Sequence, residues 1–160
     1  MTLKTNFTPG EPIWVDIATP DMDKTVAFYS SLFGWEWNGG SEEFGGYGMF
    51  TLGGKNVAGA APLMFPEQPP VWMSYVCTDD ADKTAAIVAE QGGTVLAPPM
   101  DVADLGRMAV FADPAGAAFG VWQPGTMTGA QILDDAGPLP RIHTPTPHQA
   151  PPPPPHRTPP

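Results

Sequence analysis

The sequence repeats itself at a fixed offset, and this repeat limits the folds that the chain can adopt. The segment Asp21–Ala27 (DMDKTVA) is similar to Asp80–Ala86 (DADKTAA), 59 residues further on. In the same register Gly34 corresponds to Gly93. Because chance matches of this length rarely fall in one register with their flanking residues, we expect two copies of one supersecondary unit.

Each copy has the pattern of a strand, a helix and three further strands. In the first copy, apolar and other residues alternate over 12–18, which is typical of a half-buried strand. Apolar residues then recur at helical spacing from Met22 to Phe33, and Gly34 ends the helix. Short strands follow at 35–38, 47–52 and 57–63. The second copy predicts a strand at 72–78, a helix at 80–91, and strands near 94–97, 107–112 and 117–122.

The sequence therefore predicts an α+β fold of two tandem βαβββ modules with flanking segments. We place an N-terminal arm at 1–10, module 1 at 11–65, a linker at 66–70, module 2 at 71–124, and a second linker with a Pro-rich tail at 125–160. Of the 22 prolines, 11 lie between Gly137 and Pro160, and so do all three histidines. A tail of this composition buries too little apolar surface to fold, so we expect it to be disordered.

Charge and cysteine content exclude several classes of protein. The formal net charge is -10, which argues against a protein that binds nucleic-acid phosphates. The one cysteine excludes an internal disulfide and a cysteine-cluster metal site. No apolar run reaches the roughly 20 residues of a membrane span, and Met1–Gly10 lacks the apolar stretch of a signal peptide. We expect a cytoplasmic protein that binds neither nucleic acid nor membrane.

Motifs in both copies resemble those of the vicinal-oxygen-chelate superfamily, which includes glyoxalase I, bleomycin-resistance proteins and extradiol dioxygenases. The resemblance covers residues 11–124, and within the superfamily it is similar to actinobacterial glyoxalase-like proteins labelled hydroxylases. It implies that the modules pair into a half-open, eight-stranded curved sheet with its helices outside and its site on the concave face. The matching motifs are Asp21 with Phe28-Tyr29 and Leu32-Phe33-Gly34-Trp35, then Gly92-Gly93-Thr94, Gly106-Arg107 and Asp113-Pro114-Ala115-Gly116.

The resemblance also identifies where metal enzymes of this superfamily carry their ligands. In this sequence the two first-strand positions fall on Trp14 and Met73. The two last-strand positions fall near 59–61 and on Gly120. None of these residues is a usable ligand for zinc, iron or manganese. We therefore expect the fold without the metal chemistry, with no metal and no cofactor.

Asp16 and Tyr75 are the candidate catalytic residues. By strand alternation Asp16 shares a face with Trp14, which the resemblance directs toward the cavity. A carboxylate among apolar side chains should have a raised pKa and could act as a general base. Tyr75 shares the parity of Met73 and could donate a hydrogen bond to a ligand. Alternatively, Asp16 accepts hydrogen bonds from backbone or from Tyr75 and only orders the sheet.

Large apolar and aromatic side chains form the predicted wall of a ligand-binding cavity. Arg107 could bind an anionic group of the ligand, although a surface ion pair with Asp104 or Glu90 is the simpler interpretation. The predicted ligand-binding residues are Trp14, Tyr47, Met49, Met73, Arg107, Met108, Phe111 and Trp122.

Three functions remain open at this point. The first is a glyoxalase/bleomycin-resistance-type protein that binds a hydrophobic or aromatic small molecule in a metal-free concave cavity. The second is a metal-independent enzyme, hydroxylase- or lyase-like, that uses Asp16 and Tyr75. The third is a non-catalytic interaction protein that acts through its Pro-rich tail. An open sheet edge also favours a homodimer.

Overall fold

The computed structural model describes residues 2–40 and 42–133, and its elements follow the predicted repeat. Module 1 contains β2 (Pro12–Thr19), α1 (Met22–Phe33), β3 (Glu36–Asn38), a 3-10 turn at Glu42–Phe44, β4 (Gly48–Leu52) and β5 (Lys55–Pro62). Module 2 contains β6 (Val71–Cys77), α2 (Ala81–Glu90), β7 (Thr94–Val102), β8 (Gly106–Ala112) and β9 (Ala118–Pro124). The predicted α+β fold is confirmed.

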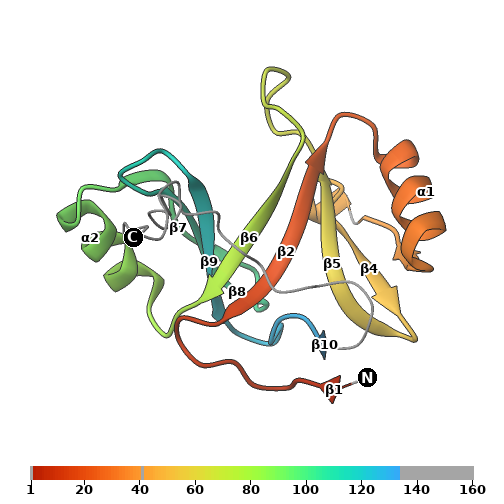
Figure 1. Ribbon diagram of the computed structural model, residues 1–160, viewed down its shortest axis with the longest axis horizontal. Coiled ribbons are helices and arrows are strands. Elements are labelled where there is room, and N and C mark those ends of the chain that lie inside the picture. Colours follow the sequence, from red (N-terminus) through yellow and green to blue (C-terminus); the bar gives the residue numbers. More distant parts are fainter. Residues whose placement is uncertain (1, 41, 134–160) are drawn as a thin grey trace, which may run out of the picture.

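One eight-stranded sheet runs through both modules in the order β3-β4-β5-β2-β6-β9-β8-β7. The first strands of the modules, β2 and β6, pair antiparallel at its centre, and each pairs in parallel with the last strand of its own module. The strand order is therefore symmetric about the centre. Figure 1 shows α1 and α2 at opposite ends of the molecule, outside the curved sheet. This is the half-open arrangement that the resemblance implied.

The turn before each helix is built in the same way. Asp21 caps α1 by accepting a hydrogen bond from the Lys24 backbone N–H at 3.0 Å, and Asp80 caps α2 through Lys83 at 2.9 Å. A side-chain oxygen at this position satisfies a backbone donor that the first helical turn leaves free. The α1 helix ends at Gly34, whose φ of 69° is the left-handed conformation that glycine adopts without strain.

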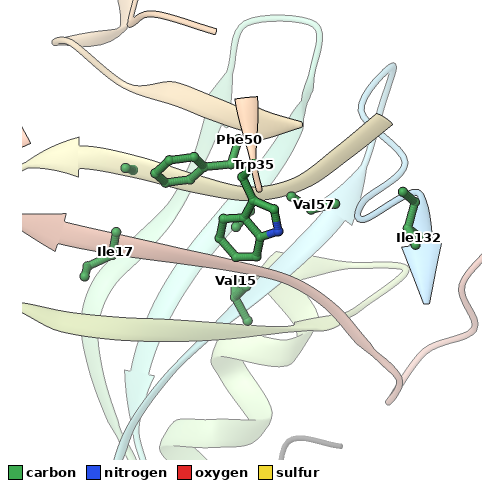
Figure 2. Close-up of a cluster of buried hydrophobic side chains, with 8 residues drawn as sticks. Val15, Ile17, Trp35, Phe50, Val57 and Ile132 are labelled. Carbon is green, nitrogen blue, oxygen red and sulfur yellow. The ribbon is translucent and has the colours of Figure 1, made fainter. Parts of the chain in front are cut away.

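Each helix covers a separate core on the outer face of the sheet. Under α1 the buried cluster gathers Val15 and Ile17 of β2 around Trp35 and Phe50, and Figure 2 shows these side chains together with Val57 and Ile132. Under α2 the corresponding cluster contains Ala81, Ala109, Phe111 and Val121. Both of these cores lie on the helix side. A third buried cluster, which includes Trp14, Tyr75 and Trp122, packs on the opposite face of the sheet.

The segments outside the modules pack against them. Strand β1 (Thr2–Leu3) pairs with β10 (Ile132–Leu133), and the Ala130 N–H donates to the Ile13 carbonyl at 2.9 Å. Residues 125–133, which we expected to be linker, therefore belong to the folded body. The predicted Pro-rich tail, from Gly137 to Pro160, lies outside the described residues. In the part of the chain that the structure describes, no helix has both the length and the hydropathy to cross a membrane.

Candidate functional site

The concave face of the sheet holds a cavity of about 390 Å³ that both modules line. Strand β2 contributes Trp14 and Asp16 to its floor, and β6 contributes Tyr75. Its wall is mainly apolar and aromatic, and one side chain in it carries a formal charge. The lining residues are Trp14, Asp16, Asn38, Gly39, Phe44, Tyr47, Gly48, Met49, Asn56, Tyr75, Val102, Leu105, Met108, Trp122 and Met127.

Asp16 is the centre of a hydrogen-bond network in this cavity. The Tyr47 hydroxyl donates to its Oδ2 at 3.2 Å, and the Tyr75 hydroxyl lies 3.5 Å from its Oδ1. The Trp14 indole N–H in turn donates to the Tyr47 oxygen at 2.8 Å. The carboxylate is thus approached from module 1 on one side and from module 2 on the other.

The repeat explains why Asp16 and Tyr75 meet. The two residues are 59 positions apart, so they occupy equivalent positions in the two modules. Trp14 lies opposite Tyr75, and Asp16 lies opposite Met73, in the antiparallel pairing of β2 with β6. Equivalent side chains of the two central strands therefore point to the same face near the local two-fold axis.

Two glycines make room for the tyrosine rings. Gly59 lies beside Asp16 in β5, and Gly120 lies beside Tyr75 in β9. A Cβ atom on Gly59 would overlap the Tyr47 phenol group, and one on Gly120 would overlap the Tyr75 ring. Each ring thus rests directly on a glycine, and any larger residue at 59 or 120 would push it away from Asp16.

Burial controls the ionisation of this network. Desolvation raises the pKa of Asp16 to about 6, and the hydrogen bonds from Tyr47 and Tyr75 oppose that rise by stabilising the charged form. Burial also raises the pKa of both tyrosines above its ordinary value, and the charge of Asp16 adds to the effect. Both hydroxyls therefore stay protonated near neutral pH and can act as donors, while Asp16 changes its charge in the physiological range.

The residues at the superfamily's metal positions do not fit a metal ion. The positions carry Trp14, Met73, Gly120 and residues near Gly59, none of which supplies an oxygen, nitrogen or thiolate ligand. The tyrosine rings occupy the space beside the two glycines. Among the described residues, no three His, Cys, Asp or Glu side chains lie close enough together to hold an ion.

Three predicted ligand-binding residues lie outside the cavity wall. Phe111 is fully buried in the core under α2, because it is three residues from Met108 on the same strand and points to the opposite face. Arg107 binds Asp82 at 3.0 Å and Asp101 at 2.8 Å rather than facing a ligand, and these partners differ from the Asp104 and Glu90 that we expected. Met73 packs against the cluster of Trp14, Tyr75 and Trp122 without lining the cavity.

The structure places the other candidates in the wall and adds residues that the sequence analysis missed. Trp14, Asp16, Tyr47, Met49, Tyr75, Met108 and Trp122 all line the cavity. The missed residues include Asn38 at the end of β3, Asn56 in β5, Val102 at the end of β7, and Leu105 and Met127 in the segments between strands. Parity along β8 would have excluded Phe111, but no pattern in the sequence indicates that the turns at 102–105 and 125–127 reach the cavity.

Comparison with known proteins assigns the chain to a family. Residues 12–121 match the model of the Glyoxalase/Bleomycin resistance protein/Dioxygenase superfamily. The anthracycline biosynthesis protein DnrV of Streptomyces peucetius is 45% identical over 148 residues, which cover 83% of this chain and 54% of DnrV. The putative glyoxylase CFP32 of Mycobacterium tuberculosis is 40% identical over 144 residues, covering 87% of this chain and 55% of CFP32. The chain thus spans about half the length of these curated relatives.

Solved structures share the fold at low sequence identity. Methylmalonyl-CoA epimerase of Mycobacterium tuberculosis superposes with a TM-score of 0.55 at 14% identity, over 78% of this chain and 93% of the epimerase. The Mn(II)-bound glyoxalase of Novosphingobium aromaticivorans also gives a TM-score of 0.55, at 19% identity over 82% of this chain and 44% of the glyoxalase. These likenesses concern the fold alone. The family model and the curated relatives establish that this chain belongs to the Glyoxalase/Bleomycin resistance protein/Dioxygenase superfamily, as its motifs predicted.

Proposed function

We propose that this protein binds a hydrophobic or aromatic small molecule in the concave cavity, without the help of a divalent metal. The observation that carries the proposal is a mainly apolar cavity to which both modules contribute. Cavities of this size that combine apolar walls with a few polar groups are the usual form of small-molecule sites. Four large side chains, Trp14, Met49, Met108 and Trp122, offer polarisable surface to a flat ring system.

The names of two curated relatives support an aromatic ligand. DnrV and DauV, which are 45% and 43% identical to this chain, are both called anthracycline biosynthesis proteins. Anthracyclines are built on flat, fused rings, which match the chemistry of the cavity wall. For this chain we therefore favour a fused-ring compound over an aliphatic one.

Equilibrium dialysis with 1,4-dihydroxyanthraquinone tests the proposal. We expect saturable binding with one site per chain. Leu105→Trp places a larger side chain in the cavity wall and should weaken binding by about tenfold or more. Leu96→Trp is the matched control, because Leu96 is 55% exposed on β7 and lies outside the wall. Absence of saturable binding, or equal loss in both variants, would contradict the proposal.

A metal-independent enzyme is the second candidate function, and the contact of Tyr75 with Asp16 favours it. An ionised Asp16 could remove a proton from the carbon next to a carbonyl group. The Tyr75 hydroxyl, which is directed at Asp16 in the structure, would then turn its proton toward the oxygen that becomes negative. The test is exchange of the α-protons of 2-tetralone with D₂O, followed by NMR. The enzyme predicts exchange faster than in buffer and lost in Asp16→Asn. Equal rates for the protein, the variant and buffer would reject this role.

The oligomeric state and the location of the protein are proposals as well. Phe28, Phe33 and Trp72 are 58%, 43% and 38% exposed and surround Tyr29, so α1 and β6 carry an aromatic patch on the surface. We expect this patch to be covered by a second copy of the chain in a homodimer. Light scattering of the purified protein should give twice the mass of one chain, and Phe28→Lys should give a monomer.

Cell fractionation tests the expected cytoplasmic location.

A further inference from the structure

The charge of the cavity wall limits which aromatic ligands it can accept. Asp16 is the one formally charged side chain among the described residues that line the cavity. The remaining polar side chains in the wall are the two tyrosines, Trp14, Trp122, Asn38 and Asn56, and none of them is cationic. An anionic group placed there would meet a carboxylate and no compensating positive charge.

The hydrogen bonds within the network use the N–H and O–H donors of Trp14, Tyr47 and Tyr75 and leave acceptor positions over. Tyr47 directs its hydroxyl proton at Asp16 Oδ2, and Tyr75 lies close to Oδ1. The Trp14 N–H is directed at the Tyr47 oxygen. A carboxylate has about four acceptor positions and each hydroxyl oxygen has two, so several acceptor positions remain without a partner from the wall.

A positively charged group would complete this arrangement. Asp16 lies where its ionised carboxylate is poorly solvated. The described residues that line the cavity include no Lys, Arg or His that could pair with it. A buried carboxylate is stabilised by a cation that also satisfies its free acceptor positions. We infer that the cavity selects ligands in which an aromatic body carries a protonated amino group, which binds Asp16 and the adjoining tyrosine oxygens. This inference rests on the proposed small-molecule function and names its substrate class.

Three probes with the same ring system separate the inference from the function on which it rests. They are 2-naphthylmethylamine, 2-naphthylmethanol and 2-naphthoate, which are respectively cationic, neutral and anionic at pH 7. Isothermal titration calorimetry should show the amine binding about tenfold more tightly than the alcohol, and the naphthoate binding most weakly. If the alcohol binds and the amine binds no better, the inference fails while the proposed function stands. If none of the three binds, both fail.

Asp16→Asn locates the source of the preference. The amide has nearly the shape of the carboxylate but no charge, so in this variant the ratio of the affinity for the amine to the affinity for the alcohol should fall from about ten to about one. Asp23→Asn is the matched control, because Asp23 is exposed in the first turn of α1 and its loss removes the same charge from the surface. A preference for the amine that persists in Asp16→Asn, or that disappears in Asp23→Asn, would overturn the inference.

The pH dependence of binding gives a second, independent readout. Among the acidic groups that line the cavity, Asp16 titrates near pH 6. Tyr47 and Tyr75 do not titrate in this range, because burial raises the pKa of each above the ordinary value for tyrosine. With an Asp16 pKa of about 6, its ionised fraction, and with it the affinity for the amine, should rise about tenfold from pH 5 to pH 7. The affinity for the alcohol should stay nearly constant. Equal pH profiles for the two probes would contradict a role for the Asp16 charge.

Discussion

The two modules agree in the turn that begins each helix and differ at the centre of the cavity. At this turn, the Thr19 and Thr25 hydroxyls are 2.7 Å apart and their counterparts in module 2 are 2.8 Å apart. On the cavity side, Asp16 in module 1 is replaced by Tyr75 in module 2. Each module needs the turn before its helix in order to fold, so both copies keep it. At the centre of the cavity, two different side chains at equivalent positions place a carboxylate next to a hydroxyl group.

The greatest loss of stability is expected from substitutions in the two cores, and these substitutions test whether the modules fold as one unit. Phe50 and Phe111 are both fully buried, one in each core, so Phe50→Ala and Phe111→Ala should each lower the free energy of unfolding by about 3–5 kcal/mol. Because β2 and β6 form one continuous sheet, both variants should lower the midpoint of a single transition in denaturant. Two separate transitions, with only one affected by each variant, would show that the modules unfold independently.

The next effect concerns Asp16, where the modules differ most. Folding raises its pKa from an ordinary 3.8 to about 6, so the folded state binds this proton more tightly than the unfolded state. The tighter proton binding of Asp16 therefore stabilises the folded state in full below pH 4, and this stabilisation is lost as the pH rises through 6. Asp16→Asn should increase the free energy of unfolding at pH 7 by up to about 3 kcal/mol.

The measurement is a series of urea unfolding curves from pH 3.5 to pH 7.5 for the wild type, Asp16→Asn and Asp23→Asn. The difference between the wild type and Asp16→Asn should be small at pH 3.5 and reach its maximum above pH 7. Asp23→Asn should follow the wild type across the whole range. If Asp16→Asn destabilises the protein at pH 7, the carboxylate orders the sheet rather than straining it.

A smaller loss of stability is expected from the threonine pair in each turn, where the two modules are alike. Thr19 and Thr78 are both buried, and each shares a hydrogen bond with a threonine in the helix that follows. Thr19→Val and Thr78→Val should each lower the free energy of unfolding by about 1 kcal/mol, because valine keeps the shape and removes the hydroxyl. The two losses should agree within experimental error. A clearly unequal pair would mean that the modules differ in stability even where their turns match.

The smallest effect is expected at Arg107, which belongs to module 2 and not to the cavity. Its ion pairs with Asp82 and Asp101 lie at the surface, where water and salt screen them. Arg107→Gln should change thermal stability slightly and leave the affinity for each naphthalene probe unchanged. A marked loss of 2-naphthoate binding in this variant would return Arg107 to the role of an anion clamp.

Much of the fold and part of the site could be predicted from local patterns. The helix ends, the glycine at position 34 and the face shared by Trp14 and Asp16 all follow from spacing and from the conformational preferences of single residues. Phe111 shows the limit of an assignment by residue type, because it is as apolar as Met108 but points to the other face. Arg107 shows the limit for charged residues, because its partners lie on other elements.

The duplication, the order of the elements and the family could all be read from the sequence. Those properties depend on residues that are near one another in the chain or that match a known pattern. The tertiary structure was needed to show that Tyr47 and Tyr75 reach Asp16 from different modules, and that Leu105 and Met127 line the cavity. The curvature of the sheet and its long-range strand pairing create these contacts, and neither leaves a local signal in the sequence.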